Sequence, residues 1–179
     1  LLSADQGWGI ITKCYIALQD DTSRQQMKLR TQRETDCGIN FSDSEWGSTL
    51  TLILEASCNA KVCLHHSNFV HRAYIIPAML HKIDPTRPTF CPKCVKLEVM
   101  YLHLVWSCPR VENYWKEVIG RCKTHNQLTM QMLLQIYLLG MNAIISKHKI
   151  KKRFVQFTLL LAKRCIAVAW LGTHIVQLY

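Results

Sequence analysis

Apolar residues recur at helical spacing along most of the chain. Residues 10–18 (IITKCYIAL) place them three and four positions apart, and a polar stretch then continues to Gly38, a residue type that commonly ends helices. We therefore predict a short helix followed by a solvated connector or a second, polar helix. Ser42 and Glu45 have the spacing of a capping box, which predicts a helix from about Asp43 into the segment TLTLILEAS.

The middle of the chain combines a helical pattern with a cluster of prolines. The segment HHSNFVHRAYIIPAMLHKI has apolar residues at helical spacing and predicts a third helix, which Pro77 should bend or break. All five prolines lie from Pro77 to Pro109. This concentration, together with the turn-like DPTRP, predicts a compact irregular module between helical parts.

The last third of the chain predicts further helices. Pro109 is well placed as the first residue of a helix through RVENYWKEVIGRC, and the apolar segment LTMQMLLQIYLLG ends at Gly140. A final helix is expected over about 151–171. On a wheel at about 100° per residue, four cations share one third of its circumference: Lys152, Arg153, Lys163 and Arg164. Four apolar residues lie opposite: Phe154, Leu161, Cys165 and Val168. We predict a largely buried helix with a single exposed basic stripe.

These elements predict a mainly α fold in which helical segments flank a small embedded zinc-knuckle-like module. We divide the chain into a helical region (1–84), the Cys-Cys-His-Cys module (85–109) and a basic helical region (110–179). The longest apolar tract, FVQFTLLLAKRCIAVAWL, contains Lys163 and Arg164, and their burial at a bilayer centre would cost several kcal/mol. We therefore expect a soluble helix and no membrane partner.

The charge of the chain is unevenly distributed. The formal net charge is +10, and no Asp or Glu occurs from Val118 to Tyr179. The cations in that stretch are Arg121, Lys123, Lys147, Lys149, Lys151, Lys152, Arg153, Lys163 and Arg164. Such a block predicts an anionic partner, most simply a nucleic-acid backbone, although a merely solvated basic face would have the same composition. We assign phosphate contacts to the cations from Lys147 onward.

Three cysteines and a histidine are spaced as in a metal site. The chain has nine cysteines and no secretion signal, so free thiols in a reducing compartment are expected in place of a disulfide framework. The segment CPKCVKLEVMYLHLVWSCP reads Cys91-x2-Cys94-x8-His103-x4-Cys108. Four such donors can complete a tetrahedron around Zn²⁺, which predicts a structural ion that supplies folding energy to a small module. The alternative is a set of buried thiols and a stray histidine.

Other chemistry-bearing residues support weaker interpretations. A second group lacks a clean ligand pair and is interpreted as core thiols and partly exposed histidines: Cys58, Cys63, His65, His66 and His71. Four residues flanking the module could touch phosphate but are more often solvated: His81, Lys82, Arg87 and Lys93. Tyr101 and Trp106 are candidates for stacking on bases, whereas core packing is the preferred interpretation of Trp106 and Trp115.

Four motifs occur in the order found in one family of mobile-element proteins. They are ETDCGINFSDSEW, HRAYIIPAMLHKIDPTRPTFCPKC, YLHLVWSCPRVENYWKEV and LLLAKRCIAVAWL. From about Ile10 to Leu171 the chain resembles the Cys-rich C-terminal region of LINE-type non-LTR retrotransposon reverse transcriptases. Because the chain begins Leu1-Leu2 without an initiator methionine, we expect an internal piece of a longer polypeptide. The resemblance places it after an endonuclease and a polymerase domain.

The resemblance implies partners and roles. It assigns Cys91, Cys94, His103 and Cys108 to nucleic-acid binding and productive reverse transcription. The implied partners are RNA, single-stranded or nicked DNA, and the rest of the parent polymerase, without a small-molecule substrate. The implied location is intracellular, in a ribonucleoprotein of nucleus and cytoplasm.

The chain also departs from the family pattern. The polymerase's paired aspartates follow an aromatic residue and an alanine, whereas Asp20-Asp21 follow Leu18-Gln19, so we do not expect an enzyme. The family has a tryptophan inside the Cys-x2-Cys pair and a glycine soon after it. Here the stretches read Pro92-Lys93 and VKLEVM, which removes easy access to positive φ and predicts a reduced affinity for zinc.

Two functions from different classes follow from these patterns. The first is a non-catalytic nucleic-acid-binding region, whose affinity should fall steeply with salt. The second is a zinc-stabilised interaction or scaffolding module that docks onto the polymerase body or a host factor. LTMQMLLQIYLLG is its candidate docking face, although a core helix is the safer interpretation of that segment.

Overall fold

The computed structural model describes residues 10–55, 57, 59–97, 99–126, 132–140 and 149–173. Within this part of the chain every regular element is a helix, which confirms the predicted mainly α fold. The chain divides into two compact units, one up to Ser42 and the other from Asp43 onward. The division into three regions proposed from the sequence differs from these two units and stays a prediction.

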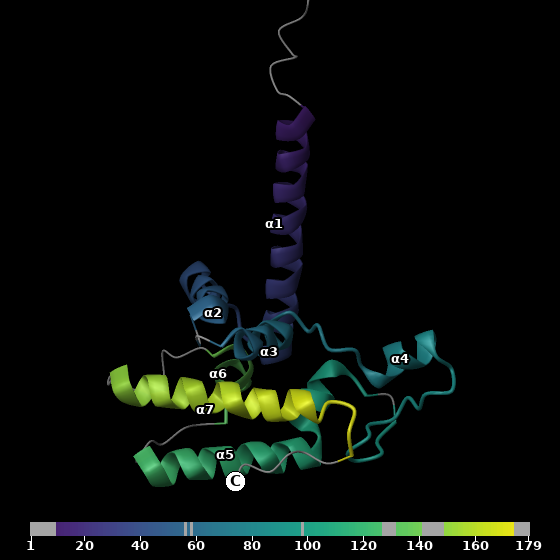
Figure 1. Ribbon diagram of the computed structural model, residues 1–179, viewed down its shortest axis with the longest axis vertical. Helices are drawn as coiled ribbons and strands as arrows, with labels where there is room; N and C mark the ends of the chain where they lie inside the picture. The colour runs from purple at the N-terminus through teal and green to yellow at the C-terminus, as the bar shows by residue number, and fades with distance from the viewer. Residues whose placement is uncertain are drawn as a thin grey trace, which may run out of the picture. The chain divides into compact units, whose positions relative to one another are not determined.

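The first unit is built on one long helix, α1 (Ile10–Cys37), drawn in purple in Figure 1. The two segments suggested by the sequence are thus continuous, and α1 ends before Gly38, whose φ of 68° lies in the left-handed region. The chain then turns back on the helix. The Glu34 carboxylate accepts hydrogen bonds from the Phe41 N–H (2.9 Å) and from Arg30 (3.1 Å). The Phe41 bond, and then Arg30, hold the pKa of Glu34 below its usual range.

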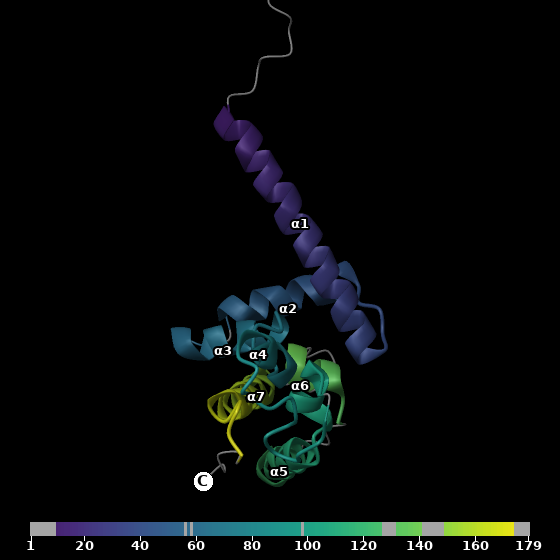
Figure 2. The ribbon, with the colours of Figure 1, turned by 90° about the vertical axis from the view of Figure 1, so that its right-hand side faces the viewer.

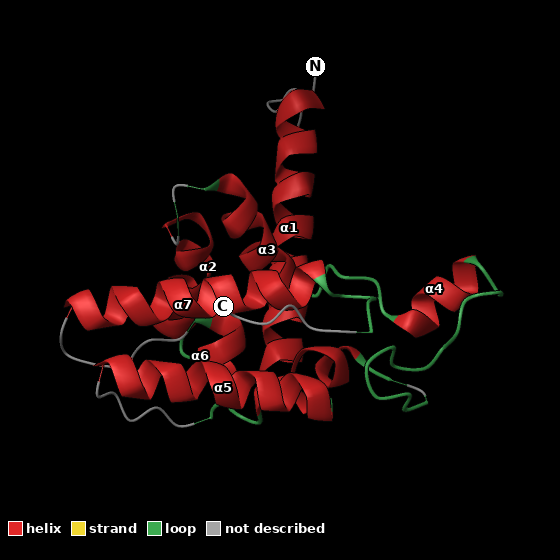
Figure 3. Ribbon diagram, turned by 60° about the horizontal axis from the view of Figure 1, so that its bottom comes forward, coloured by secondary structure: helices red, strands yellow, loops and turns green. Residues whose placement is uncertain are grey.

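The second unit contains the remaining helices. They are α2 (Asp43–Glu55), α3 (Ala60–Val70), α4 (Pro77–Ile83), the π-helical turn η1 (His103–Ser107), α5 (Pro109–Asn126), α6 (Leu134–Leu139) and α7 (Lys149–Val168). α7 packs against α3 and α5, and α3 also contacts α2 and α6 (Figure 1). α4 stands apart from this bundle on long loops (Figure 3). The predicted helix starts at Asp43 and Pro109 are confirmed.

The third helix predicted from the sequence is divided in two. α3 ends at Val70, and Arg72 then adopts a positive φ of 53°. The chain stays irregular until Pro77, which opens α4 in its first turn. Proline suits this position because the first N–H groups of a helix have no intrahelical acceptor. The break expected at Pro77 is therefore real, and the proline begins the second helix.

The short helix α6 ends at a residue whose backbone conformation favours glycine. Gly140 has a φ of 74°, and its N–H donates to the Ile136 carbonyl at 3.1 Å. A Cβ at this position would lie 2.4 Å from Cδ2 of Leu52. The end predicted at Gly140 is confirmed. The left-handed conformation favours glycine, and a larger residue would also force the Leu52 side chain to shift.

Aromatic side chains form much of the core around α5 and α6. Trp115 is fully buried, and its Nε1 donates to the Val105 carbonyl at 3.0 Å. Its ring centroid lies 5.2 Å from that of Tyr137 and 6.2 Å from that of Trp106. The preferred interpretation of Trp115 as a core residue is confirmed.

α7 turns a different side to the core from the one predicted. Its buried side chains are Val155, Leu159, Leu160, Ala162, Lys163 and Ile166. Phe154 and Val168, expected inside, are 46% and 66% exposed. The predicted single basic stripe is wrong, because Lys163 is only 1% exposed whereas Arg153 and Arg164 face solvent. Among the described residues, no helix is both long and apolar enough to cross a membrane.

Lys163 is buried because polar atoms of two neighbouring helices accept hydrogen bonds from its ammonium group. Nζ donates to the Leu138 carbonyl in the last turn of α6 (3.0 Å) and to Nδ1 of His66 on α3 (2.9 Å). The last carbonyls of a helix lack intrahelical donors and favour a cation. Burial, and secondarily the Lys163 charge, lower the pKa of His66 to about 2, so this imidazole is neutral.

Acidification should destabilise the protein through His66. The folded imidazole remains neutral until about pH 2, whereas in the unfolded chain it titrates near its ordinary pKa of about 6.5. Stability that is fully present above pH 6.5 is therefore lost as the pH falls, by about 2 kcal/mol at pH 5. Urea unfolding of the wild type and of His66→Gln at pH 7.5, 6.5 and 5.0 measures this loss, which should be smaller in the variant by that amount. Equal losses in both proteins would contradict the assignment.

Candidate metal centre

The first two predicted ligands lie on a tight turn. The Cys91 N–H donates to the Lys96 carbonyl at 2.8 Å, and the Val95 N–H donates back to the Cys91 carbonyl at 2.9 Å. These two hydrogen bonds close residues 91–96 into a loop that brings Cys91 and Cys94 to the same side. Cys91 is fully buried and Cys94 is partly buried. The turn thus has the form expected for a Cys-x2-Cys pair.

The other two predicted ligands lie at the ends of one π-helical turn. η1 begins at His103, and the Cys108 N–H donates to the His103 carbonyl at 2.8 Å, closing a bond between residues five apart. This wider turn explains how the x4 spacing places the imidazole and the thiol close together. Cys108 directly precedes α5, and the backbone N–H groups of Arg110 and Val111 donate to its sulfur.

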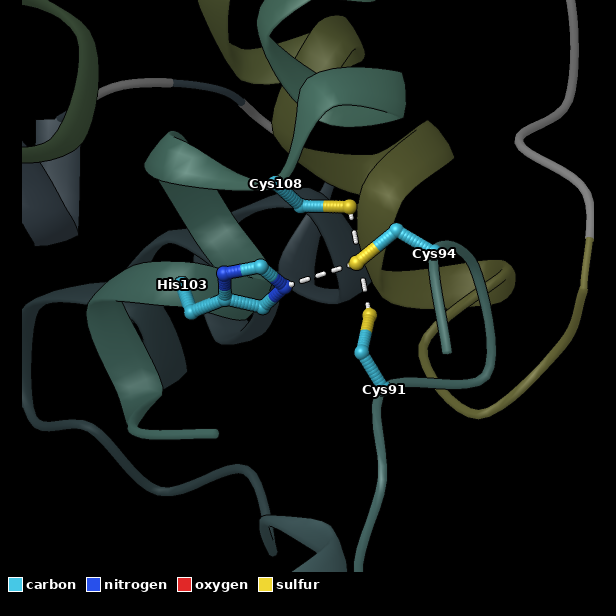
Figure 4. A group of neighbouring side chains, drawn as sticks. All are labelled: Cys91, Cys94, His103 and Cys108. Atoms are coloured by element: carbon cyan, nitrogen blue, oxygen red, sulfur yellow. Dashed lines mark hydrogen bonds between the residues drawn. The ribbon is translucent and has the colours of Figure 1, made fainter. Parts of the chain in front are cut away.

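The structure brings all four predicted ligands into one group. The donor atoms of Cys91, Cys94, His103 and Cys108 all lie within 4.8 Å of one another (Figure 4). Cys91 Sγ is 3.9 Å from Cys108 Sγ, and Cys94 Sγ is 3.2 Å from His103 Nε2. A tetrahedral ion with metal–sulfur bonds of about 2.3 Å has edges of about 3.8 Å between its ligand atoms. These four side chains could therefore hold a metal ion with small adjustments of their rotamers.

The environment of the thiols is mixed. Burial raises the pKa of Cys108 to about 11, against the effect of the N–H groups at the start of α5. Burial also acts on Cys94, but the Lys96 N–H and the other two thiols outweigh it and place the pKa of Cys94 below its usual value. Burial and the charge of Lys96 lower the pKa of His103, which keeps the imidazole in the neutral form that ligates metals.

Lys93, inside the Cys-x2-Cys turn, connects the metal centre to the end of α7. Its side chain is 5% exposed, and Nζ donates to the carbonyls of Ala169 and Trp170, both at 2.8 Å. The interpretation of Lys93 as a solvated residue or phosphate contact is therefore wrong. The cation occupies the carboxyl end of α7, where carbonyls lack intrahelical donors. Nothing in the local sequence distinguishes such a lysine from an exposed one.

Val95, the residue after Cys94, adopts a φ of 60°. Left-handed backbone is costly for a β-branched residue, by about 1–2 kcal/mol. The turn thus adopts positive φ next to the Cys-x2-Cys pair, in the stretch VKLEVM where the sequence offers no glycine. The side chain is 66% exposed, so it contributes little packing in return.

Of the two predicted stacking residues, Tyr101 is buried and Trp106 is partly buried. Tyr101 is 4% exposed, its OH donates to the Phe69 carbonyl at 3.2 Å, and the Arg72 guanidinium lies 5.0 Å from its ring centroid. The prediction that Tyr101 stacks on bases is therefore wrong. Trp106 lies 5.5 Å from the ring of Tyr137, which agrees with the preferred core interpretation.

The predicted phosphate-binding cations are distributed between surface and core. Arg153 and Arg164 are exposed on α7, and Lys163 is buried and cannot contact a phosphate. The backbone of α7 includes Lys149, Lys151 and Lys152, but their side chains are not among the described parts of the structure. Lys147 lies outside the described residues. Further exposed cations are Arg121 and Lys123 on α5.

The second group of cysteines and histidines forms no metal site among the described residues. His66 is bonded to Lys163, and Nδ1 of His65 lies 2.8 Å from the Tyr74 hydroxyl. Cys58 lies outside the described residues. Described cysteines outside the metal centre are free thiols, as predicted: Cys14, Cys37, Cys63, Cys122 and Cys165.

Comparisons of the sequence with protein-family models and with curated proteins found no match. The metal centre is therefore interpreted from its own chemistry.

Proposed function

We propose that this chain is a non-catalytic nucleic-acid-binding region stabilised by one structural Zn²⁺. The observation that carries the proposal is the gathering of Cys91, Cys94, His103 and Cys108 within 4.8 Å, in a chain with a formal charge of +10. Three sulfurs and one imidazole are the donors of closed structural zinc sites. Because all four ligands come from the protein, no coordination position remains for a substrate or a water molecule.

The surroundings of the site suit zinc. Three thiolates around Zn²⁺ leave one net negative charge, and the buried ammonium of Lys93 lies close enough to Cys91 and Cys108 to interact with both charges. A charge held in a poorly solvated site favours a nearby opposite charge. The ion would tie the Cys-x2-Cys turn to η1, and Lys93 ties that turn to α7. The zinc would thus hold together elements that carry exposed cations.

Nucleic acid is the partner that the charge supports best. The stretch from Val118 to Tyr179 contains no acidic residue, and Arg121, Lys123, Arg153 and Arg164 are exposed in it. These observations support the proposal of a LINE-type reverse transcriptase C-terminal region that engages RNA or opened DNA beside its polymerase. The competing docking face is weakened, because Ile136 to Leu139 are buried in α6.

A salt titration tests the proposed function. The full chain, loaded with zinc, is titrated onto a fluorescein-labelled 12-nucleotide oligouridine at 50–300 mM KCl. We expect the affinity to fall steeply with salt, and Arg121→Gln/Lys123→Gln to reduce the slope of log K against log salt by about 0.7 per charge removed. A matched control is Lys116→Gln, because Lys116 is paired with Glu112 at 2.6 Å. Absence of binding at 50 mM KCl, or binding independent of salt, would overturn the proposal.

Replacing Val95 by glycine should tighten zinc binding about fivefold, or by about 1 kcal/mol. Glycine relieves the left-handed strain of the turn, and its greater freedom in the unfolded chain offsets part of that gain. The measurement is a zinc titration against a chelating dye. Val95→Ala is the control, since it keeps a Cβ at positive φ and should bind zinc nearly as the wild type does. Equal affinities of the glycine variant and the wild type would show that the turn is unstrained in the loaded protein.

A further inference from the structure

α7 packs against α3 and α5 (Figure 2). Among the residues that the structure describes, the opposite side of the helix carries exposed side chains. The exposed large apolar residues on this face are Phe154, Phe157 and Val168. At about 100° per residue they fall within one third of the circumference, together with Arg153 and Arg164. We call this set the outer face of α7.

Two phenylalanines lie about one helical turn apart on the outer face. Phe154 is 46% exposed and Phe157 is 48% exposed. Residues three apart on a helix are neighbours, with Cβ atoms about 5–6 Å apart. Phenylalanine is usually buried, so two half-exposed rings one helical turn apart place flat apolar faces at the surface. Such a surface is suited to a ligand that presents flat apolar faces of its own.

Positive charge flanks the rings on both sides. Arg153 directly precedes Phe154, and Arg164 lies two turns beyond Phe157, about 10 Å along the helix axis. Both arginines are exposed, and the sequence of α7 contains no Asp or Glu. A second copy of this chain would place arginines against arginines, so self-association through this face is opposed by charge.

We propose that Phe154 and Phe157 form a stacking platform for unpaired bases of single-stranded RNA, with Arg153 and Arg164 contacting the phosphates on either side. This inference rests on the proposed nucleic-acid-binding function and assigns it a site. The chemistry favours a single strand over a duplex, because duplex bases are already stacked on one another and cannot reach the rings. The proposal assigns base stacking to Phe154 and Phe157, whose rings are exposed, whereas the ring of Tyr101 is buried.

The experiment removes the two rings without changing any charge. The double variant Phe154→Leu/Phe157→Leu keeps apolar side chains but loses the flat rings. Because base stacking on an aromatic ring is a large part of single-strand affinity, we expect it to bind the 12-nucleotide oligouridine at least about tenfold more weakly. Its slope of log K against log salt should equal that of the wild type, since no charge changes. A double-stranded RNA of the same length should lose less than about twofold.

Control variants separate stacking from other effects. Phe157→Trp should bind the oligouridine as tightly as the wild type or more tightly. Val168→Ser, on the same face but away from the rings, should change the affinity by less than about twofold. Circular dichroism and thermal unfolding check that each variant folds. If oligouridine binds the wild type but the leucine variant binds equally well, the stacking platform is wrong and the proposed function stands. If the leucine variant loses only binding of a leucine- and glutamate-rich amphipathic peptide, the face docks protein instead. If the wild type binds no RNA, both proposals fail.

Discussion

Replacing Cys108 by serine should lower the free energy of unfolding by about 3–4 kcal/mol in the presence of zinc. Small zinc modules bind their ion with about 10–16 kcal/mol, and one lost ligand of four removes roughly a quarter of that. Cys108 Sγ is fully buried and lies 3.9 Å from Cys91 Sγ, so no water easily replaces it. Urea unfolding with added zinc and with a chelator measures the zinc-linked part of the loss.

A second buried cysteine provides the control for that measurement. Cys122 is 2% exposed on α5 and lies outside the group of four donors. Cys122→Ala should cost about 1 kcal/mol through lost packing, by the same amount with and without zinc. Absorption of the Co²⁺-loaded protein gives an independent readout, since thiolate-to-cobalt bands should weaken only in the Cys108 variant. A loss that is equal with zinc and with chelator would identify Cys108 as a packing thiol.

The effect of losing the ion should extend beyond the module. Lys93 Nζ donates hydrogen bonds to the carbonyls of Ala169 and Trp170. The ring centroid of Trp170 lies 4.8 Å from that of Tyr74 and 5.7 Å from that of Tyr101. When the Cys-x2-Cys turn loosens, the cation at the end of α7 loses its position and the aromatic cluster loses one wall. Elements coupled through one set of contacts unfold together. We therefore expect a bound ion to stabilise the core of the second unit as well as the module.

The helices and the ligand set could be predicted because their signals are local. Gly38 and Gly140 end helices at positive φ, Pro109 begins one, and Pro77 separates α3 from α4. Each of these outcomes depends on the conformational preferences of one residue and its near neighbours. The ligands belong to this class as well, since 18 residues from Cys91 to Cys108 contain all four.

The orientation of α7 could not be predicted because it depends on distant partners. A helical wheel places Lys163 beside Arg164 and Arg153 as one basic stripe. The structure separates Lys163 from the two arginines, since the Leu138 carbonyl and His66 Nδ1 accept hydrogen bonds from its ammonium group within the core. Lys93 also differs from an exposed lysine through distant partners, because it donates to carbonyls at the end of α7 that lie 76 and 77 positions later in the chain. Periodicity reports hydrophobicity along one helix, and it carries no information on which carbonyls of another helix lack donors.

Replacing Lys163 by alanine should lower the free energy of unfolding by about 3–5 kcal/mol. The change removes a buried side chain and takes the donor away from the Leu138 carbonyl and from Nδ1 of His66. Both acceptors then lie in the core without that hydrogen bond, and a cavity remains beside them. Lys163→Met fills the cavity but restores no donor, so its loss should be about 1–3 kcal/mol.

The neighbouring cation is a matched control for Lys163. Arg164 is the next residue on α7 and is exposed, so Arg164→Ala should change the free energy of unfolding by less than about 0.5 kcal/mol. Removing the Lys163 charge should also raise the pKa of His66, because that charge is the second cause of its lowering after burial. The acid-induced loss of stability should therefore be smaller in Lys163→Met than in the wild type. If Lys163→Ala and Arg164→Ala cost the same small amount, Lys163 faces solvent and α7 has the orientation that its basic stripe predicts.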